Sequence, residues 1–86
     1  MRIEEIELHR INRPLPKQTD KNKVKRLAQS IAEEGLREPI DVLEVDGKYY
    51  GFSGCHRYEA HQLLAKETIK CRIRRAPYSV LRSHLA

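Results

Sequence analysis

The sequence predicts one small α+β domain with a mixed sheet, two main helices and a short C-terminal helix. Runs rich in β-branched residues are interrupted by stretches whose apolar residues recur at helical spacing. The resulting order is strand, helix, strand, strand, helix, strand, helix. A chain of 86 residues has room for one core, so we expect residues 1–86 to form a single domain.

The first half of the chain holds a short strand at residues 3–8 and the first main helix. Residues 13–16 contain two prolines, which disfavour helix in the residue before each. Asp20 then suits a helix N-cap, and Gly35 suits a stop, which predicts a helix over residues 21–34. Its apolar stripe has the spacing i, i+3, i+4, i+7 and i+8: Val24, Leu27, Ala28, Ile31 and Ala32.

A hairpin follows the first helix. Residues 40–45 are largely apolar and β-branched, and residues 48–52 form the expected returning strand. Between them stands Asp46-Gly47, a strong signal for a two-residue hairpin turn.

The last third alternates helix and strand again. A second helix is expected from about residue 55 to about residue 66. Residues 68–74 alternate apolar and basic side chains, which is the pattern of a half-buried strand. Pro77 can start a final helix that runs to residue 85.

Charge, cysteine content and the lack of long apolar runs limit the classes of protein to which this chain can belong. The formal net charge of +5 suits a nucleotide, a nucleic acid or an acidic partner surface, but many small basic proteins bind none of these. Two cysteines without Cys-x-x-Cys spacing argue against a disulfide scaffold or a zinc site, although a Cys55–Cys71 disulfide stays open. No apolar run could cross a bilayer and no signal-peptide pattern opens the chain, so we expect a cytoplasmic location.

Cys55 is the main candidate for chemistry. It stands where a glycine-containing loop turns into a helix, next to His56 and Arg57. Free N–H groups and the positive end of a helix dipole favour a thiolate there and can also bind phosphate. A free cysteine is often only a small buried apolar residue, and that interpretation fits Cys71, which shares the apolar face of a predicted strand.

Two further groups have weaker signals. Lys23, Arg26 and Ser30 share one face of the first helix, which would approach the Cys55 loop if the two helix starts converge. An ordinary solvated face explains the same spacing, and the sequence alone favours it. Asp41 interrupts an apolar strand, and a carboxylate there must be exposed or paired, so it could hold an arginine or orient the site.

The segment from Phe52 to Ala60, Phe-Ser-Gly-Cys-His-Arg-Tyr-Glu-Ala, resembles the signature of the sulfiredoxin family. Residues 13–16, 20–30, 39–42 and 67–69 fall in the order that this family shows. The compact domain of the family resembles the N-terminal domain of ParB partition proteins, which agrees with the predicted order of elements.

The resemblance implies ATP- and Mg²⁺-dependent repair of hyperoxidised two-cysteine peroxiredoxins, whose cysteine sulfinic acid ordinary thiols cannot reduce. The sulfinate would be phosphorylated to a sulfinic phosphoryl ester, by direct attack on ATP or after phosphorylation of Cys55; we favour direct attack. Cys55 would then form a thiosulfinate with the peroxiredoxin. An external thiol, thioredoxin or glutathione, would resolve it.

The resemblance also implies roles for individual residues. Four side chains match family positions that bind ATP phosphates or nucleotide: Lys23, Ser30, His56 and Arg57. Backbone N–H groups of Gly54 and Cys55 would complete this site, with Mg²⁺ held mainly by phosphate oxygens and water. Arg13 and Asp41 match positions near the reactive cysteine, where Arg13 would stabilise the thiolate. Leu15 and Phe52 match apolar positions that face the peroxiredoxin.

Two rival functions stay open at this point. A ParB-like DNA- or nucleotide-binding module would suit the positive charge, but ParB boxes typically have Glu-Arg-Arg where this chain has Cys55-His56-Arg57, and a cysteine has no evident purpose there. A non-catalytic peroxiredoxin-binding adaptor would keep Leu15 and Phe52 and tolerate Cys55→Ser. We favour the enzyme, expect a monomer, and do not expect a nucleic-acid partner.

Overall fold

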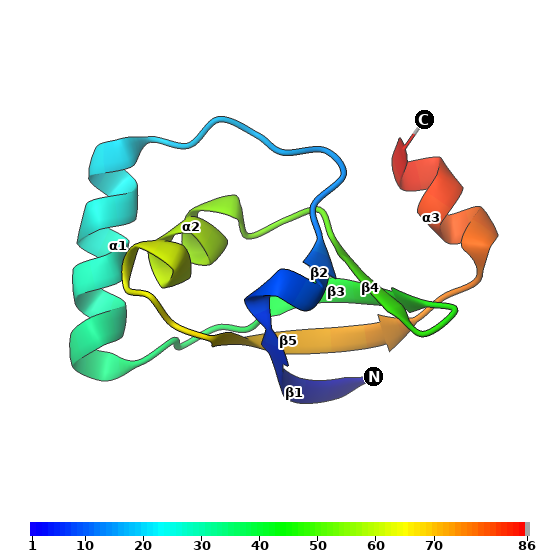
Figure 1. The fold of residues 1–86 in the computed structure, drawn as a ribbon, viewed down its shortest axis with the longest axis horizontal. Coiled ribbons are helices and arrows are strands. Elements are labelled where there is room, and N and C mark those ends of the chain that lie inside the picture. Colours follow the sequence, from blue (N-terminus) through cyan, green and yellow to red (C-terminus); the bar gives the residue numbers. More distant parts are fainter. Residues whose placement is uncertain (86) are drawn as a thin grey trace.

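The computed structural model describes residues 1–85, which form a five-stranded sheet with helices at both of its ends (Figure 1). The strands are β1 (Arg2–Glu7), β2 (Ile11–Asn12), β3 (Ile40–Val45), β4 (Lys48–Gly51) and β5 (Thr68–Arg75). The helices are α1 (Lys21–Glu34), α2 (Cys55–Leu63) and α3 (Tyr78–Leu85), and a short 3₁₀ turn, η1 (Leu8–Arg10), follows β1.

The sheet is mixed and has the strand order β1-β5-β3-β4-β2. β1 runs antiparallel to β5 and β3 antiparallel to β4, whereas β3 is parallel to β5 and β2 is parallel to β4. The predicted α+β class with a mixed sheet, two main helices and a short C-terminal helix is therefore confirmed. Neither η1 nor β2 was predicted, because two or three residues are too few to show a period.

Helix α1 has the predicted bounds. The Asp20 carboxylate accepts hydrogen bonds from the backbone N–H groups of Asn22 (3.0 Å) and Lys23 (3.3 Å). These bonds hold the pKa of Asp20 below its usual value, because they stabilise the ionised carboxylate. The helix ends at Gly35, whose φ of +79° suits glycine.

Helix α2 ends three residues before the predicted end at residue 66, so that boundary was wrong. Ala65 adopts a left-handed φ of +56°, and its N–H bonds the carbonyl of Gln62 (3.0 Å) while Lys66 N–H bonds that of His61 (2.9 Å). This is the Schellman arrangement, which usually uses glycine. The sequence did not predict this helix end, because an alanine stands where a glycine is usual.

The two faces of the sheet pack against different helices. One face packs against Tyr58 of α2 through a cluster of buried apolar residues: Ile6, Ile11, Ile40, Val42, Tyr49, Ile69, Cys71 and Ile73. The other face carries Leu43 and Val45, which pack against Leu81 of α3. Helix α1 packs on α2 through a third set: Val24, Ala28, Ile31 and Ala60.

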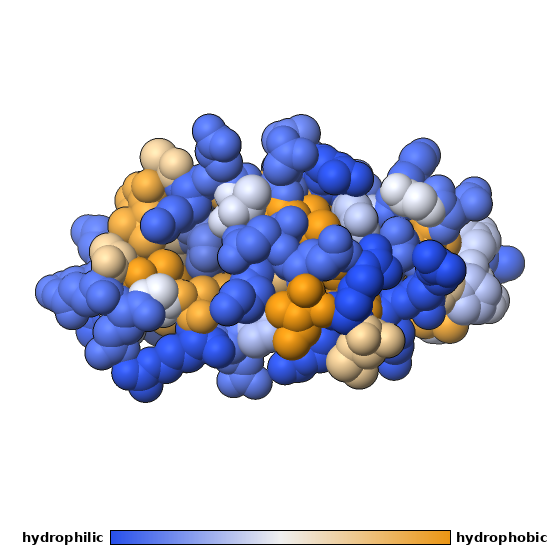
Figure 2. Space-filling model, turned by 90° about the horizontal axis from the view of Figure 1, so that it is seen from below, coloured by the Kyte–Doolittle hydropathy of each residue, from blue (hydrophilic) through white to orange (hydrophobic). Residues whose placement is uncertain are grey.

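Cys71 is fully buried and donates a hydrogen bond from Sγ to the Ile69 carbonyl over 3.3 Å, which confirms its structural role. Both cysteines are free thiols, so the structure contains no Cys55–Cys71 disulfide. The face in Figure 2 is mostly hydrophilic, as expected for a chain with 34% charged residues. No helix within residues 1–85 is long and apolar enough to cross a membrane.

Candidate active site

The site is built at the first turn of α2, where Gly54 is the N-cap. Gly54 has a left-handed φ of +71°, and a Cβ there would lie 2.5 Å from Cγ2 of Ile40. Only glycine therefore lets this loop turn so close to β3. The first bond of the helix runs from Tyr58 N–H to Gly54 O (2.8 Å), so the three preceding N–H groups, those of residues 55–57, are free for a ligand.

Cys55 lies beside a cation from a distant part of the chain. Arg13 Nη2 donates a hydrogen bond to Cys55 Sγ over 3.0 Å, and Arg13 Nη1 donates to the Ser53 carbonyl over 2.9 Å. Both side chains are half-buried. These bonds place a cation and a directed N–H donor at the sulfur.

Tyr58 supports the same arginine. The Arg13 guanidinium carbon lies 5.0 Å from the centre of the Tyr58 ring, and the Tyr58 hydroxyl donates to the Leu8 carbonyl over 2.9 Å. No role in the site was predicted for Tyr58 from the sequence. The available signal was its spacing, because residues three apart in a helix share one face.

A cavity of about 160 Å³ opens next to Cys55. It is lined by Arg13, Pro16, Lys17, Thr19, Cys55, Tyr58, Glu59 and Gln62. The Lys21 ammonium pairs with the Glu59 carboxylate over 2.8 Å, and this ion pair, followed by the bond from Thr19, lowers the pKa of Glu59. Because the charge of the Glu59 carboxylate is balanced by Lys21, the positive charges of Arg13 and Lys17 dominate the cavity lining. The cavity therefore suits a small anionic group.

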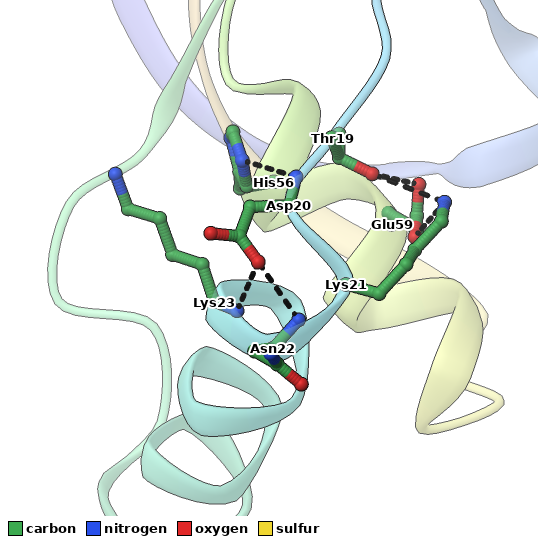
Figure 3. Close-up of polar contacts among 7 residues, drawn as sticks. All are labelled: Thr19, Asp20, Lys21, Asn22, Lys23, His56 and Glu59. Carbon is green, nitrogen blue, oxygen red and sulfur yellow. Dashed lines mark hydrogen bonds and ion pairs between the residues drawn. The ribbon is translucent and has the colours of Figure 1, made fainter.

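Figure 3 shows how the start of α1 meets α2. Glu59 accepts hydrogen bonds from the Thr19 hydroxyl (2.7 Å) and from Lys21, while the backbone N–H of Asp20 donates to Nε2 of His56 (3.2 Å). The two helix starts therefore converge, which is the condition for the face of α1 with Lys23 to approach the Cys55 loop; the sequence alone favoured an ordinary solvated face. The Lys23 side chain extends from this first turn of α1 toward the level of the His56 ring.

Arg57 points to another side of the helix. Its Nη1 donates to the carbonyls of Glu38 and Pro39, both over 3.0 Å. Arg57 and Ser30 line a common cavity of about 330 Å³ near the C-terminal end of α1. Lys23 does not line that cavity, so the structure brings Ser30, but not Lys23, to Arg57.

The remaining predicted site residues lie elsewhere. The Asp41 carboxylate pairs with Arg72 over 3.1 Å and lines a third cavity, of about 200 Å³, together with Phe52. The Phe52 ring stacks on His84 of α3 at a centroid distance of 4.8 Å. Asp41 thus holds an arginine, but neither Asp41 nor Phe52 lines the Cys55 cavity. Leu15 is 46% exposed.

Within residues 1–85, no three His, Cys, Asp or Glu side chains come together as a metal site. The first turn of α2 instead carries the thiol of Cys55 and the free N–H groups, and the Arg13 guanidinium reaches this turn from the segment between β2 and α1.

Comparison with known proteins assigns the family. Residues 1–84 match the ParB N-terminal domain family. The chain is 58% identical to the chloroplastic/mitochondrial sulfiredoxin of Arabidopsis thaliana over an alignment of 85 positions, which covers 96% of this chain and 68% of that protein.

Two solved structures place the fold. Sulfiredoxin from Arabidopsis thaliana superposes with a TM-score of 0.97 at 56% identity, covering 100% of this chain and 99% of that one. ParB from Caulobacter crescentus in complex with CTP-γ-S superposes with a TM-score of 0.74 at 23% identity, covering 88% of this chain and 46% of that one, which shows the fold alone. The chain is therefore an enzyme of the sulfiredoxin family, built on the fold of the ParB N-terminal domain.

Proposed function

We propose that this protein reduces the cysteine sulfinic acid of hyperoxidised two-cysteine peroxiredoxins, with ATP and Mg²⁺, through a covalent link to Cys55. The observation that carries the proposal is the 3.0 Å hydrogen bond from Arg13 to Cys55 Sγ, at the start of a helix with free N–H groups. Family membership supports the peroxiredoxin-repair role in general.

The first step makes a leaving group. A sulfinate oxygen attacks the γ-phosphorus of ATP, the bond from that phosphorus to the ADP oxygen breaks, and a sulfinic phosphoryl ester forms. The free N–H groups of residues 55–57 would bind the phosphates, together with Lys23 and His56, which extend from the starts of α1 and α2. Arg57, in the same turn of α2, would add a guanidinium. Mg²⁺ held by phosphate oxygens and water would neutralise part of their charge.

The second step uses the thiolate. Cys55 Sγ attacks the sulfinyl sulfur, an S–S bond forms, the bond from sulfur to the phosphate oxygen breaks, and inorganic phosphate leaves. The product is a thiosulfinate between Cys55 and the peroxiredoxin. Arg13, which donates to both Sγ and the Ser53 carbonyl, would keep the thiolate aimed into the cavity.

The last steps regenerate the enzyme. An external thiol, from thioredoxin or glutathione, attacks the Cys55 sulfur and releases the peroxiredoxin as a sulfenic acid, which leaves a mixed disulfide on Cys55. A second thiol then attacks the external sulfur of this mixed disulfide, which releases Cys55 as a thiolate and joins the two external thiols in a disulfide. Cys71 has no part in this exchange because it is fully buried.

The nucleotide site is supported by two observations. The ParB structure that shares this fold contains CTP-γ-S, an analogue of a nucleoside triphosphate. In this chain, the cavity of Ser30 and Arg57 lies next to the first turn of α2, which suits it to hold the rest of the nucleotide once the phosphates lie at that turn.

The partner surface is proposed to include Leu15, which is exposed and lies two residues after Arg13, and Phe52, which lies three residues before Cys55. The protein would act as a monomer, because residues 1–85 already carry every side chain that the scheme uses. A cytoplasmic location remains a prediction, to be tested by fractionation, since the plant relative is named for chloroplasts and mitochondria.

The test follows loss of the sulfinic form by mass spectrometry in a mixture of the protein, sulfinylated peroxiredoxin, ATP, Mg²⁺ and a thiol. Wild type should repair the peroxiredoxin, Cys55→Ser should not, and Cys71→Ser should. Repair by Cys55→Ser would contradict the proposal. So would an inactive wild type that forms a salt-sensitive DNA complex, because that result would favour the ParB-like module.

A further inference from the structure

We propose that Tyr58 is a positioning residue for the reactive cysteine: its aromatic ring holds the Arg13 guanidinium in place against Cys55 Sγ. The inference rests on the proposed function only in taking Cys55 as the nucleophile. It adds to that function by naming the side chain that keeps the arginine aimed.

Arg13 needs such support because of where it comes from. It lies in the segment that arches from β2 to α1, outside any helix or strand (Figure 1). A free arginine side chain has many rotamers, and fixing it costs conformational entropy. Its two hydrogen bonds, to Ser53 O and to Cys55 Sγ, fix the edge of the guanidinium but leave its face uncovered.

The Tyr58 ring covers that face. The guanidinium carbon lies 5.0 Å from the ring centre, within the range of a cation–π interaction. Because Tyr58 lies one helical turn after Cys55, the ring and the sulfur are on the same side of α2, and both line the same cavity.

The hydroxyl of Tyr58 fixes the ring in turn. It donates to the Leu8 carbonyl over 2.9 Å, in the 3₁₀ turn that leads into β2 and then to Arg13. The ring also packs against the core cluster of the sheet. Tyr58 therefore joins three parts of the site: the turn before β2, the arginine after it and the helix that carries Cys55.

A purely structural aromatic residue would have the same packing, so the test must isolate the electrostatics of the ring. Alkylation of Cys55 by iodoacetamide near neutral pH, followed by mass spectrometry, reports the thiolate without ATP or peroxiredoxin. We expect Tyr58→Phe to react at a rate within about twofold of wild type, and Tyr58→Leu about three- to tenfold more slowly, the loss expected for one cation–π contact.

Two further comparisons separate the electrostatic contact of the ring with Arg13 from the packing of the ring. The variant Tyr58→pentafluorophenylalanine keeps the shape of Tyr58→Phe but removes the negative potential of the ring face. Its Cys55 should be alkylated more slowly than that of Tyr58→Phe, and this comparison holds even if Tyr58→Leu fails to fold. In an Arg13→Ala background, Tyr58→Leu should have no further effect, because the cation is gone.

Equal alkylation rates for phenylalanine and its fluorinated form would overturn the proposal. So would the same slowing by Tyr58→Leu with and without Arg13. Neither outcome depends on repair activity, so a failure of this inference is distinct from a failure of the proposed function.

Discussion

The guanidinium of Arg13 donates a hydrogen bond to the sulfur of Cys55 over 3.0 Å, although 42 positions separate the two residues. Arg13 also donates to Ser53 and stacks on Tyr58, so three contacts fix it. This arrangement places a cation at the nucleophile while the free N–H groups of α2 stay available for phosphate.

Removing that cation should slow repair. We expect Arg13→Ala to reduce the repair rate about ten- to hundredfold, the loss expected for one hydrogen bond to a charged group. The measurement is the loss of sulfinylated peroxiredoxin under single-turnover conditions. Arg10→Ala is the matched control, because Arg10 also stacks on a tyrosine, Tyr49, but does not line the Cys55 cavity. Equal loss in both variants would contradict a specific role for Arg13.

Two residues of the proposed phosphate site should differ in their effect on the stability of the fold. Lys23→Ala should raise the KM for ATP about tenfold without changing the free energy of unfolding, because the residue is exposed. Arg57→Ala should raise the KM and also destabilise the fold by about 1–3 kcal/mol, because two backbone carbonyls lose their donor. ATP titrations and urea unfolding measure the two effects. Lys25→Ala, elsewhere on α1, is the control, and if it matches Lys23→Ala the assigned site is wrong.

Gly54 should tolerate no side chain. Gly54→Ala should reduce the free energy of unfolding by about 2–4 kcal/mol, because a left-handed φ and contact with Ile40 both oppose the added methyl. Gly47→Ala is matched to it: Gly47 has a similar φ of +78°, but no atom lies within 4 Å of an added Cβ, so we expect a loss of about 1–2 kcal/mol. Urea unfolding compares the pair. Equal losses would show that the Ile40 side chain can move aside, so that its contact with the added methyl does not contribute to the loss of stability.

Cys71 should make stability fall at alkaline pH. Burial, and next the charge of Glu5, raises the pKa of the Cys71 thiol from its usual 9.0 to about 11. Between these values the unfolded chain loses the proton while the folded protein keeps it, so this contribution to stability is complete below pH 9.0 and declines up to about pH 11.

Cys71→Ala tests that contribution, because it removes the thiol and leaves the other groups that titrate in this range. The difference in unfolding free energy between wild type and variant should be constant below pH 9.0 and should shrink above it. A difference that stays constant through pH 11 would contradict the assignment.

Local patterns predicted most of the fold and little of the site's geometry. The bounds of α1 follow from Asp20, the apolar stripe and Gly35, which all lie within one segment. The end of α2 was missed because Ala65, not a glycine, adopts the left-handed conformation. The contact between Arg13 and Cys55 depends on how β2 and α2 are placed by the sheet, and no spacing encodes that; only the family resemblance put Arg13 near the cysteine.

The surroundings of Asp41 could also be predicted only in part from the sequence. The sequence marked it as a carboxylate in need of a partner, and the structure supplies Arg72, which faces it across the β3–β5 pairing. Which face of the sheet this pair occupies depends on register, and the register places it with Phe52 rather than with Cys55.

The most direct test of the central claim is to trap the covalent link. Wild type mixed with sulfinylated peroxiredoxin, ATP and Mg²⁺, without an external thiol, should give an ATP-dependent adduct of the two proteins on a non-reducing gel, and peptide mapping should place the link at Cys55. An added thiol should dissolve the adduct. Consumption of the sulfinic form with no adduct, or with a link that maps to Cys71, would contradict the account.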